Sequence, residues 1–265
     1  METRDEEQSL ARATEGDKLT AWKSLATLWR FVFWDFPFHE TGLDYDEYWA
    51  EAGKGEPGPA RLARFRAIAA HIEPGSSVLD IGCGDGELLA HLRETKGVTA
   101  HGLEFSAAGR ARAQEKGLDV QPCDLTSPDF SVEREVDYIV ISEVLEHVPN
   151  PEEVLLKVRD RFRKRLIITI PNVGSIIDRL RLVFGRFAHQ WVFHPSEHLR
   201  FWTITDFCFT CRQLGYTVER FDGLYTPYLP SFLKLWAWYP RLFAPHVLYV
   251  LAWSEEGTAY SFSNP

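Results

Sequence analysis

Residues 77–87 read S-V-L-D-I-G-C-G-D-G-E, and this stretch decides the fold class. Val78, Leu79 and Ile81 predict a short buried strand, which the glycines at 82, 84 and 86 end in a tight turn. The next six residues, E-L-L-A-H-L, have apolar side chains at helical spacing. A strand, a glycine turn and a helix are typical of the first βα unit of a nucleotide-type fold, whose ligand approaches the strand's carboxyl end.

The charge of the glycine turn indicates which ligand it takes. A dinucleotide fingerprint, G-x-G-x-x-G, needs glycine or alanine where this chain has Glu87. Asp80, Asp85 and Glu87 would repel a pyrophosphate, whereas carboxylates at close range favour a cation. We therefore expect S-adenosylmethionine, which has no phosphate and carries a sulfonium and an ammonium.

The V-L-D-I-G-C-G-D-G run resembles the first motif of the class I S-adenosylmethionine-dependent methyltransferases, and the resemblance extends from about residue 59 to residue 223. It implies an α/β fold: a doubly wound, mostly parallel, seven-stranded Rossmann-like sheet with an N-terminal lid and a cap over the cleft. It also implies a set of cofactor-binding residues: Asp80, Gly82, Cys83, Gly84, Gly86, Glu104, Phe105, Asp124, Leu125, Ser142 and Glu143.

Two acids in this set stand at the ends of expected strands. Glu104 closes the strand expected over 98–106, where a carboxylate accepts hydrogen bonds from both ribose hydroxyls. Asp124 closes the third strand and would bind the exocyclic amine of adenine, with Leu125 packed on the ring. The alternative for Asp124 is a cap of a helix or turn.

Strands and helices alternate after this point. We expect strands over 136–142, 165–172, 216–223 and 246–253, the last two as an antiparallel edge, and helices over 107–116, 151–164 and 204–214. Thr203 and Asp206 predict a capping box for the last helix.

The fourth strand runs into E-V-L-E-H-V at 143–148. Glu143, Glu146 and His147 have i, i+3 and i+4 spacing, so on a helix they share one face, and we expect His198 to join them. Carboxylates and imidazole can bind a divalent metal such as magnesium, which would activate an acceptor hydroxyl. The alternatives are His147 or His198 as a general base beside Glu143, and a purely structural role.

Two groups within the methyltransferases are similar to this chain. The block P-N-V-G-S…E-H-L-R-F-W-T-I-T-D-F…L-G-Y resembles the methionine biosynthesis protein W group, which is not expected to carry E-V-L-E-H-V. Ubiquinone-biosynthesis O-methyltransferases and small-RNA 3′-end 2′-O-methyltransferases carry E-x-x-E-H. The resemblances imply methylation of a hydroxyl on a small or lipidic acceptor, or a non-catalytic partner of another enzyme.

Composition limits the partners and the location. A net charge of −9 argues against a sequence-independent grip on nucleic acid, which needs Lys and Arg facing phosphates. Nine tryptophans leave open a peripheral membrane contact as well as ordinary packing. Four cysteines without a secretory signal suggest a reduced, cytoplasmic protein, and we expect the C-x-x-C at 208–211 to be core packing. The oligomeric state does not follow from the sequence.

The domain organisation is expected to centre on residues 59–254, the methyltransferase domain, with cap insertions at 173–202 and 225–245. Residues 21–58 are expected to form a lid whose aromatic Y-D-E-Y-W segment at 45–49 closes over the cofactor. Residues 1–20 and 255–265 are expected to be tails. The aromatic block at 25–38 is too short and too charged to span a bilayer.

Overall fold

The computed structural model describes residues 29, 32–33, 46–47, 49, 58–188, 198–224 and 234–253. The expected tails, most of the lid and parts of both cap insertions therefore lie outside the described residues. Within this part of the chain no helix is both long enough and apolar enough to cross a membrane.

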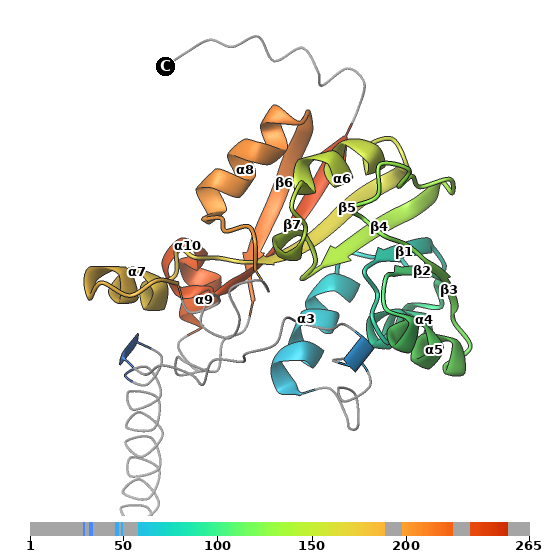
Figure 1. The fold of residues 1–265 in the computed structure, drawn as a ribbon, viewed down its shortest axis with the longest axis horizontal. Coiled ribbons are helices and arrows are strands. Elements are labelled where there is room, and N and C mark those ends of the chain that lie inside the picture. The colour runs from blue at the N-terminus through green and yellow to red at the C-terminus, as the bar shows by residue number, and fades with distance from the viewer. Residues whose placement is uncertain are drawn as a thin grey trace, which may run out of the picture.

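A single seven-stranded sheet forms the centre of the fold, in the order β3-β2-β1-β4-β5-β7-β6 (Figure 1). The strands β3, β2, β1, β4 and β5 are parallel, whereas β7 runs antiparallel to both of its neighbours, β5 and β6. The expected fold class and its antiparallel edge are confirmed. In chain order the strands are β1 (Ser77–Ile81), β2 (Thr99–Glu104), β3 (Asp119–Pro122), β4 (Val136–Ser142), β5 (Phe162–Pro171), β6 (Tyr216–Gly223) and β7 (His246–Trp253).

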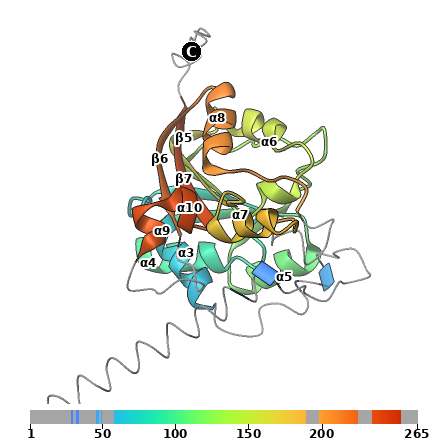
Figure 2. The same ribbon diagram turned by 90° about the vertical axis from the view of Figure 1, so that its left-hand side faces the viewer.

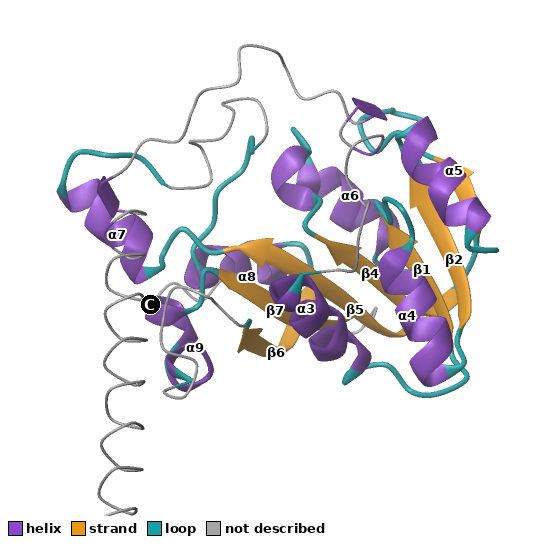
Figure 3. Cartoon of the chain, turned by 90° about the horizontal axis from the view of Figure 1, so that it is seen from below, coloured by secondary structure: helices purple, strands orange, loops and turns teal. Residues whose placement is uncertain are grey.

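Helices cover both faces of the sheet (Figure 3). They are α3 (Pro59–Ala69), α4 (Glu87–Lys96), α5 (Ala107–Glu115), the 3-10 turn η1 (Leu145–His147), α6 (Pro151–Val158), α7 (Ile176–Val183), α8 (Ile204–Gln213), α9 (Leu235–Trp238) and α10 (Pro240–Phe243).

The central strand β4 shows how its sequence produces this layering. Side chains alternate between the two faces of a strand, and here both faces are apolar. Ile139 and Ile141 belong to the core on the side of α6 and α8, and Tyr138 and Val140 to the core beneath α3 and α4. Burying each such side chain stabilises the fold by about 1.5–3 kcal/mol.

Two local predictions have different outcomes. The cap of α8 is confirmed: the Asp206 amide donates to Thr203 Oγ1 at 3.2 Å. The predicted helix over 151–164 is wrong in its second half, because α6 ends at Val158 and β5 begins at Phe162. Phe162 is buried and pairs in register with Val136, so residues 162–165 belong to a strand and not to the predicted helix.

Both cysteines of the C-x-x-C are buried on α8, within the same core as Phe207. Their thiols are free, and the interpretation as core packing is confirmed.

Candidate functional site

The glycine turn after β1 adopts a backbone that side chains rarely tolerate. Gly82, Gly84 and Gly86 have φ angles of 75°, 55° and 73°. A Cβ atom on Gly84 would come within 2.2 Å of Trp49 Cζ2, so the Trp49 ring lies directly against this glycine. The backbone of the turn is therefore approached closely by the segment that precedes α3.

Two of the three acids of this turn have basic partners, which the sequence analysis did not anticipate. Asp85 is buried and contacts Arg61 at 3.1 Å and Lys116 at 3.2 Å, and Glu87 contacts Arg61 at 3.1 Å. The carboxylates of Asp85 and Glu87 are therefore paired within the protein. Asp80 is the acid of the turn that stays available.

Asp80 is 2% exposed, and its Oδ1 atom has no hydrogen-bond partner among the described residues. Burial and the nearby Glu104 carboxylate raise the pKa of Asp80 to about 7, against an opposing effect of Arg64. A buried carboxylate without partners is costly, so this oxygen is suited to bind a cationic group.

Arg64, on α3, is a site residue that sequence reasoning missed. Its Nε atom is buried and has no hydrogen-bond partner in the described part of the chain, and its guanidinium lies 3.6 Å from Glu143 Oε2. Asp80 and Arg64 thus place an unsatisfied acceptor and an unsatisfied donor of opposite charge near the carboxyl ends of β1 and β4. Arg64 is one of three arginines in α3, and nothing in the sequence distinguishes it from the other two.

Glu104 closes β2 as predicted, and its side chain is buried. Oε2 accepts a hydrogen bond from the Gly84 amide at 2.8 Å, and Oε1 accepts one from the Ser106 amide at 2.8 Å. Burial raises the pKa of Glu104, although these two hydrogen bonds favour the ionised form. The carboxylate therefore links the glycine turn to the end of β2.

The remaining cofactor candidates occupy several environments. Phe105 follows Glu104 and is 61% exposed, so one ring face can receive a planar ligand. Asp124 forms a turn, its Oδ1 accepting from the Thr126 amide at 2.8 Å, while Leu125 packs partly against the core. Cys83 is buried, and Ser142 Oγ lies 2.9 Å from Thr169 Oγ1.

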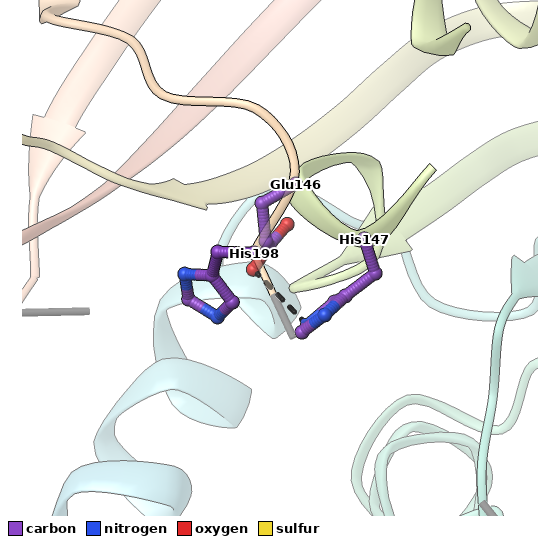
Figure 4. Close-up of side chains that lie close together, drawn as sticks. All are labelled: Glu146, His147 and His198. Atoms are coloured by element: carbon purple, nitrogen blue, oxygen red, sulfur yellow. Dashed lines mark ion pairs between the residues drawn. The ribbon is translucent and has the colours of Figure 1, made fainter. Parts of the chain in front are cut away.

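The E-V-L-E-H-V segment separates into two groups of side chains. Glu146, His147 and His198 bring their ligand atoms within 4.8 Å of one another, and we call them the trio (Figure 4). The His147 and His198 rings meet edge to face at 4.7 Å. Backbone bonds hold this arrangement, because the Leu199 amide donates to the Glu146 carbonyl at 2.7 Å.

Glu143 does not join the trio, in contrast to the expected shared helical face. The 3-10 turn begins at Leu145, and Glu143 lies before it with a φ of 56°. Its Oε2 accepts from His246 Nδ1 at 2.7 Å, and its Oε1 accepts from Thr169 Oγ1 at 2.9 Å. Burial alone would raise the pKa of Glu143, but the charges of His246 and Arg64 hold it well below the usual range.

His246 is a second residue that the sequence analysis missed. It is the first residue of β7 and lies opposite Pro171, the last residue of β5. Because β7 is antiparallel, its start reaches the edge where the parallel strands end. A histidine at the first position of an expected antiparallel strand was the available signal.

His198 is held in its neutral form. Burial and the neighbouring His147 lower the pKa of His198 to about 4. Its Nδ1 atom is buried without a hydrogen-bond partner among the residues the structure describes. Neutral imidazole is the form that binds metals and accepts protons.

Comparison with known proteins agrees with this architecture. The family model described as methionine biosynthesis protein MetW matches residues 62–251, a range that includes E-V-L-E-H-V. The motif and this family thus occur together here, although the sequence analysis did not expect it. The bifunctional methionine biosynthesis protein MetXA/MetW of Rhodopirellula baltica is 32% identical over 166 residues, 56% of this chain and 26% of that protein.

Relatives named ubiquinone biosynthesis O-methyltransferase are similar as well. The Pseudomonas savastanoi protein is 37% identical over 87 residues, 31% of this chain and 37% of its own length. The Shewanella sp. ANA-3 protein is 27% identical over 207 residues, 69% of this chain and 86% of that protein. The chain thus spans only 26% of the Rhodopirellula protein and 37% of the Pseudomonas protein.

Solved structures agree on the fold. An S-adenosylmethionine-dependent methyltransferase of Mesorhizobium loti has a TM-score of 0.55 at 16% identity, over 73% of this chain and 98% of that chain. A methyltransferase of Archaeoglobus fulgidus has a TM-score of 0.52 at 18% identity, over 72% and 91% of the two chains. The chain has the class I methyltransferase fold.

Proposed function

The chain belongs to the methionine biosynthesis protein MetW family, and on that premise we propose that it binds S-adenosylmethionine and methylates a hydroxyl of a small or lipidic acceptor. The observation that carries the proposal is the pair of unsatisfied groups on Asp80 and Arg64. An amino acid end with an ammonium and a carboxylate matches one buried acceptor and one buried donor of opposite charge.

The other candidate residues suit the rest of such a ligand. Glu104 has both carboxylate oxygens engaged with backbone amides, and each oxygen has further lone pairs for ribose hydroxyls. Phe105 would stack on the adenine, and Asp124 with Leu125 would border its amine side. Gly82, Gly84 and Gly86 give the turn its positive φ angles, and Val144, Trp49 and Leu118 occupy the space where their Cβ atoms would lie.

The chemistry divides between the bound cofactor and the protein. The cofactor supplies an electrophilic methyl on a sulfonium, so that a C–O bond forms, a C–S bond breaks and the acceptor proton leaves to a base. His246 is our choice for that base. Glu143 accepts a hydrogen bond from its Nδ1, so the lone pair of the ring lies on Nε2, on the side of the ring away from Glu143. The remaining contribution of the protein is alignment of the two reactants.

The trio fits a divalent ion. The trio offers two imidazoles and one carboxylate, with ligand atoms within 4.8 Å of one another. A donor set with two imidazoles binds transition-metal ions in preference to magnesium. Glu146, His147 and His198 would hold the ion, and Glu143 would stay with His246. Bound there, a divalent ion supplies Lewis acidity that lowers the pKa of an acceptor hydroxyl.

A second function remains a candidate because of one relative. The Rhodopirellula protein is named as bifunctional, MetXA/MetW, and this chain aligns with a quarter of it. A non-catalytic chain that associates with another enzyme of methionine biosynthesis would match that arrangement.

Calorimetry with S-adenosylmethionine and S-adenosylhomocysteine tests the proposal. We expect a dissociation constant of the order of micromolar, as for ordinary small-ligand sites, and at least a tenfold loss in Glu104→Ala. Glu94→Ala, an exposed acid on α4, is the matched control and should bind as the wild type. Absence of binding by the wild type would favour the partner function, and mass spectrometry of molecules retained on purification would then identify the true ligand.

A further inference from the structure

One side of the molecule carries exposed apolar side chains on two separate elements. On α7 and just after it these are Leu182, Val183 and Phe184, of which Val183 is 76% exposed. On α9 and just after it they are Trp238 and Tyr239, and Trp238 is 78% exposed. Helices α7, α9 and α10 lie on the same side of the fold, which faces the viewer in Figure 2.

The orientation of α7 explains why its apolar side chains are exposed. The inner face of α7 is held in place by buried polar groups: Ser175 Oγ donates to Asp178 at 2.8 Å, and Arg181 Nε donates to the Phe187 carbonyl at 2.8 Å. With that face fixed, the helix must present Leu182 and Val183 outwards. Trp29, itself 64% exposed, extends this surface through a ring contact of 4.2 Å with Phe33, which lies 4.8 Å from Phe184.

The charge of this side is opposite to that of the whole chain. The net charge of the protein is −9. Yet residues 174–188 contain three arginines, of which Arg179 is exposed, Arg186 is half-buried and Arg181 is buried, and one aspartate, Asp178, which is buried as well. Residues 234–253 contain Lys234 and Arg241, both exposed, and no acid. The exposed apolar side chains therefore stand in a positively charged surrounding.

We infer that this face, formed by α7 and α9–α10, docks on the surface of an anionic lipid bilayer. Exposed aromatic and aliphatic side chains with basic neighbours are the composition that lies in the headgroup region, where tryptophan is preferred and Lys and Arg are attracted to anionic lipids.

The same face leads towards the trio. The Phe187 and Phe201 rings meet at 5.3 Å, Phe201 and His198 at 6.5 Å, and His198 and His147 at 4.7 Å. An acceptor with a long apolar tail could keep that tail in the bilayer while its hydroxyl reaches the site. This extension to the acceptor class rests on the proposed methyl transfer, whereas the docking itself does not.

Co-sedimentation of the full chain with vesicles tests the docking, without cofactor or acceptor. We expect binding to vesicles of phosphatidylcholine with about one third phosphatidylglycerol, at least tenfold weaker binding to phosphatidylcholine alone, and weakening by salt. Val183→Asp combined with Phe184→Ser should reduce binding at least tenfold, and so should Trp238→Ser alone. Phe209→Ser, which removes an equally exposed aromatic on α8, should bind as the wild type.

Three results would overturn the inference. The wild type stays in the supernatant with anionic vesicles; the α7 and α9 variants sediment as well as Phe209→Ser; or the wild type is a dimer that Val183→Asp with Phe184→Ser dissociates, which would make the face an interface between copies. Circular dichroism tests whether each variant is folded. If the double variant is unfolded, the result with Trp238→Ser alone tests the inference. A chain that sediments but does not bind S-adenosylmethionine would refute the proposed function alone.

Discussion

His246 Nδ1 lies 2.7 Å from Glu143 Oε2, although the two residues are 103 positions apart in the sequence. Glu143 is at the end of the central strand β4, and His246 opens the antiparallel strand β7. The contact joins the parallel and antiparallel halves of the sheet at the edge that also contains Arg64 and the trio. It also explains why Glu143 is not available to Glu146 and His147.

Removing His246 should change how stability depends on pH. A carboxyl whose pKa is lowered on folding stabilises the protein above its unfolded pKa, and that contribution is lost as the pH falls towards the folded value. In His246→Ala the pKa of Glu143 is lowered less, so the free energy of unfolding should fall less steeply below about pH 4.5. Urea unfolding at several pH values measures this slope.

The control for this experiment is His71→Ala, which removes a histidine 3.4 Å from Asp222 near the surface. It should retain the wild-type slope, because Asp222 keeps a second basic partner, Arg220, whose Nε lies 2.6 Å from its Oδ2. Equal slopes in all three proteins would show that His246 does not depress the pKa of Glu143.

Asp80 should couple cofactor binding to pH. With a pKa of about 7, part of this carboxyl is protonated at neutral pH, and a bound ammonium would favour the ionised form. The affinity for S-adenosylmethionine should therefore rise with pH through about 7, with release of a proton. Calorimetry in buffers of different ionisation enthalpy measures that proton.

Asp80→Asn should lose affinity and also lose the pH dependence, because asparagine does not titrate. Its stability relative to the wild type should improve as the pH rises from about 4 to 7, since over that range the unfolded wild type has released the Asp80 proton while the folded wild type still holds it. A wild-type affinity that is constant over this range would contradict the role given to Asp80.

Gly84→Ala should destabilise the protein more than Gly97→Ala. Both glycines have positive φ angles, 55° and 63°, so alanine at either costs about 1–2 kcal/mol of backbone strain. Only at Gly84 would the new Cβ also meet the Trp49 ring, because nothing lies within 4 Å of Gly97. The difference between the two free energies of unfolding isolates the contact with Trp49.

The test of this interpretation is a double-mutant cycle with Trp49→Ala. In that background Gly84→Ala and Gly97→Ala should cost the same within about 0.5 kcal/mol. A persistent difference would mean that the glycine turn is constrained by something other than Trp49.

Divalent ions should stabilise the chain through the trio. After treatment with a chelator, addition of manganese at 100 times its dissociation constant should raise the free energy of unfolding by about 2.7 kcal/mol. His198→Ala should abolish this increase, whereas Glu143→Gln should keep it, because Glu143 lies outside the trio. The trio is not a metal site if neither manganese nor magnesium changes the stability of the wild type.

The sequence predicted the sheet well, for identifiable reasons. The strand over 136–142 has the observed bounds because its residues are apolar on both faces, which a parallel strand inside the sheet requires. The strand over 162–171 begins earlier than expected because five of the seven residues at 159–165 are basic, and the one buried ring, Phe162, was not weighted above them.

The site was less predictable, because its pairings cross the chain. Glu104 follows from its place at the end of β2, and that position is local information. The ion pair of Arg61 with Asp85 and the contacts of Glu143 with His246 and Arg64 arise only when α3 and β7 reach the same edge of the sheet. The sequence shows which residues carry charge, but only the tertiary structure shows which of these charges are paired.

The position of β7 has a consequence for synthesis on the ribosome. This strand lies between β5 and β6, yet both neighbours precede it in the chain. Synthesis proceeds from the N-terminus, so about 75 residues are added after β5 before its partner β7 begins. Strand β6 also stays unpaired until β7 has been made. The nascent protein thus exposes an unpaired edge of β5 until β7 has been synthesised.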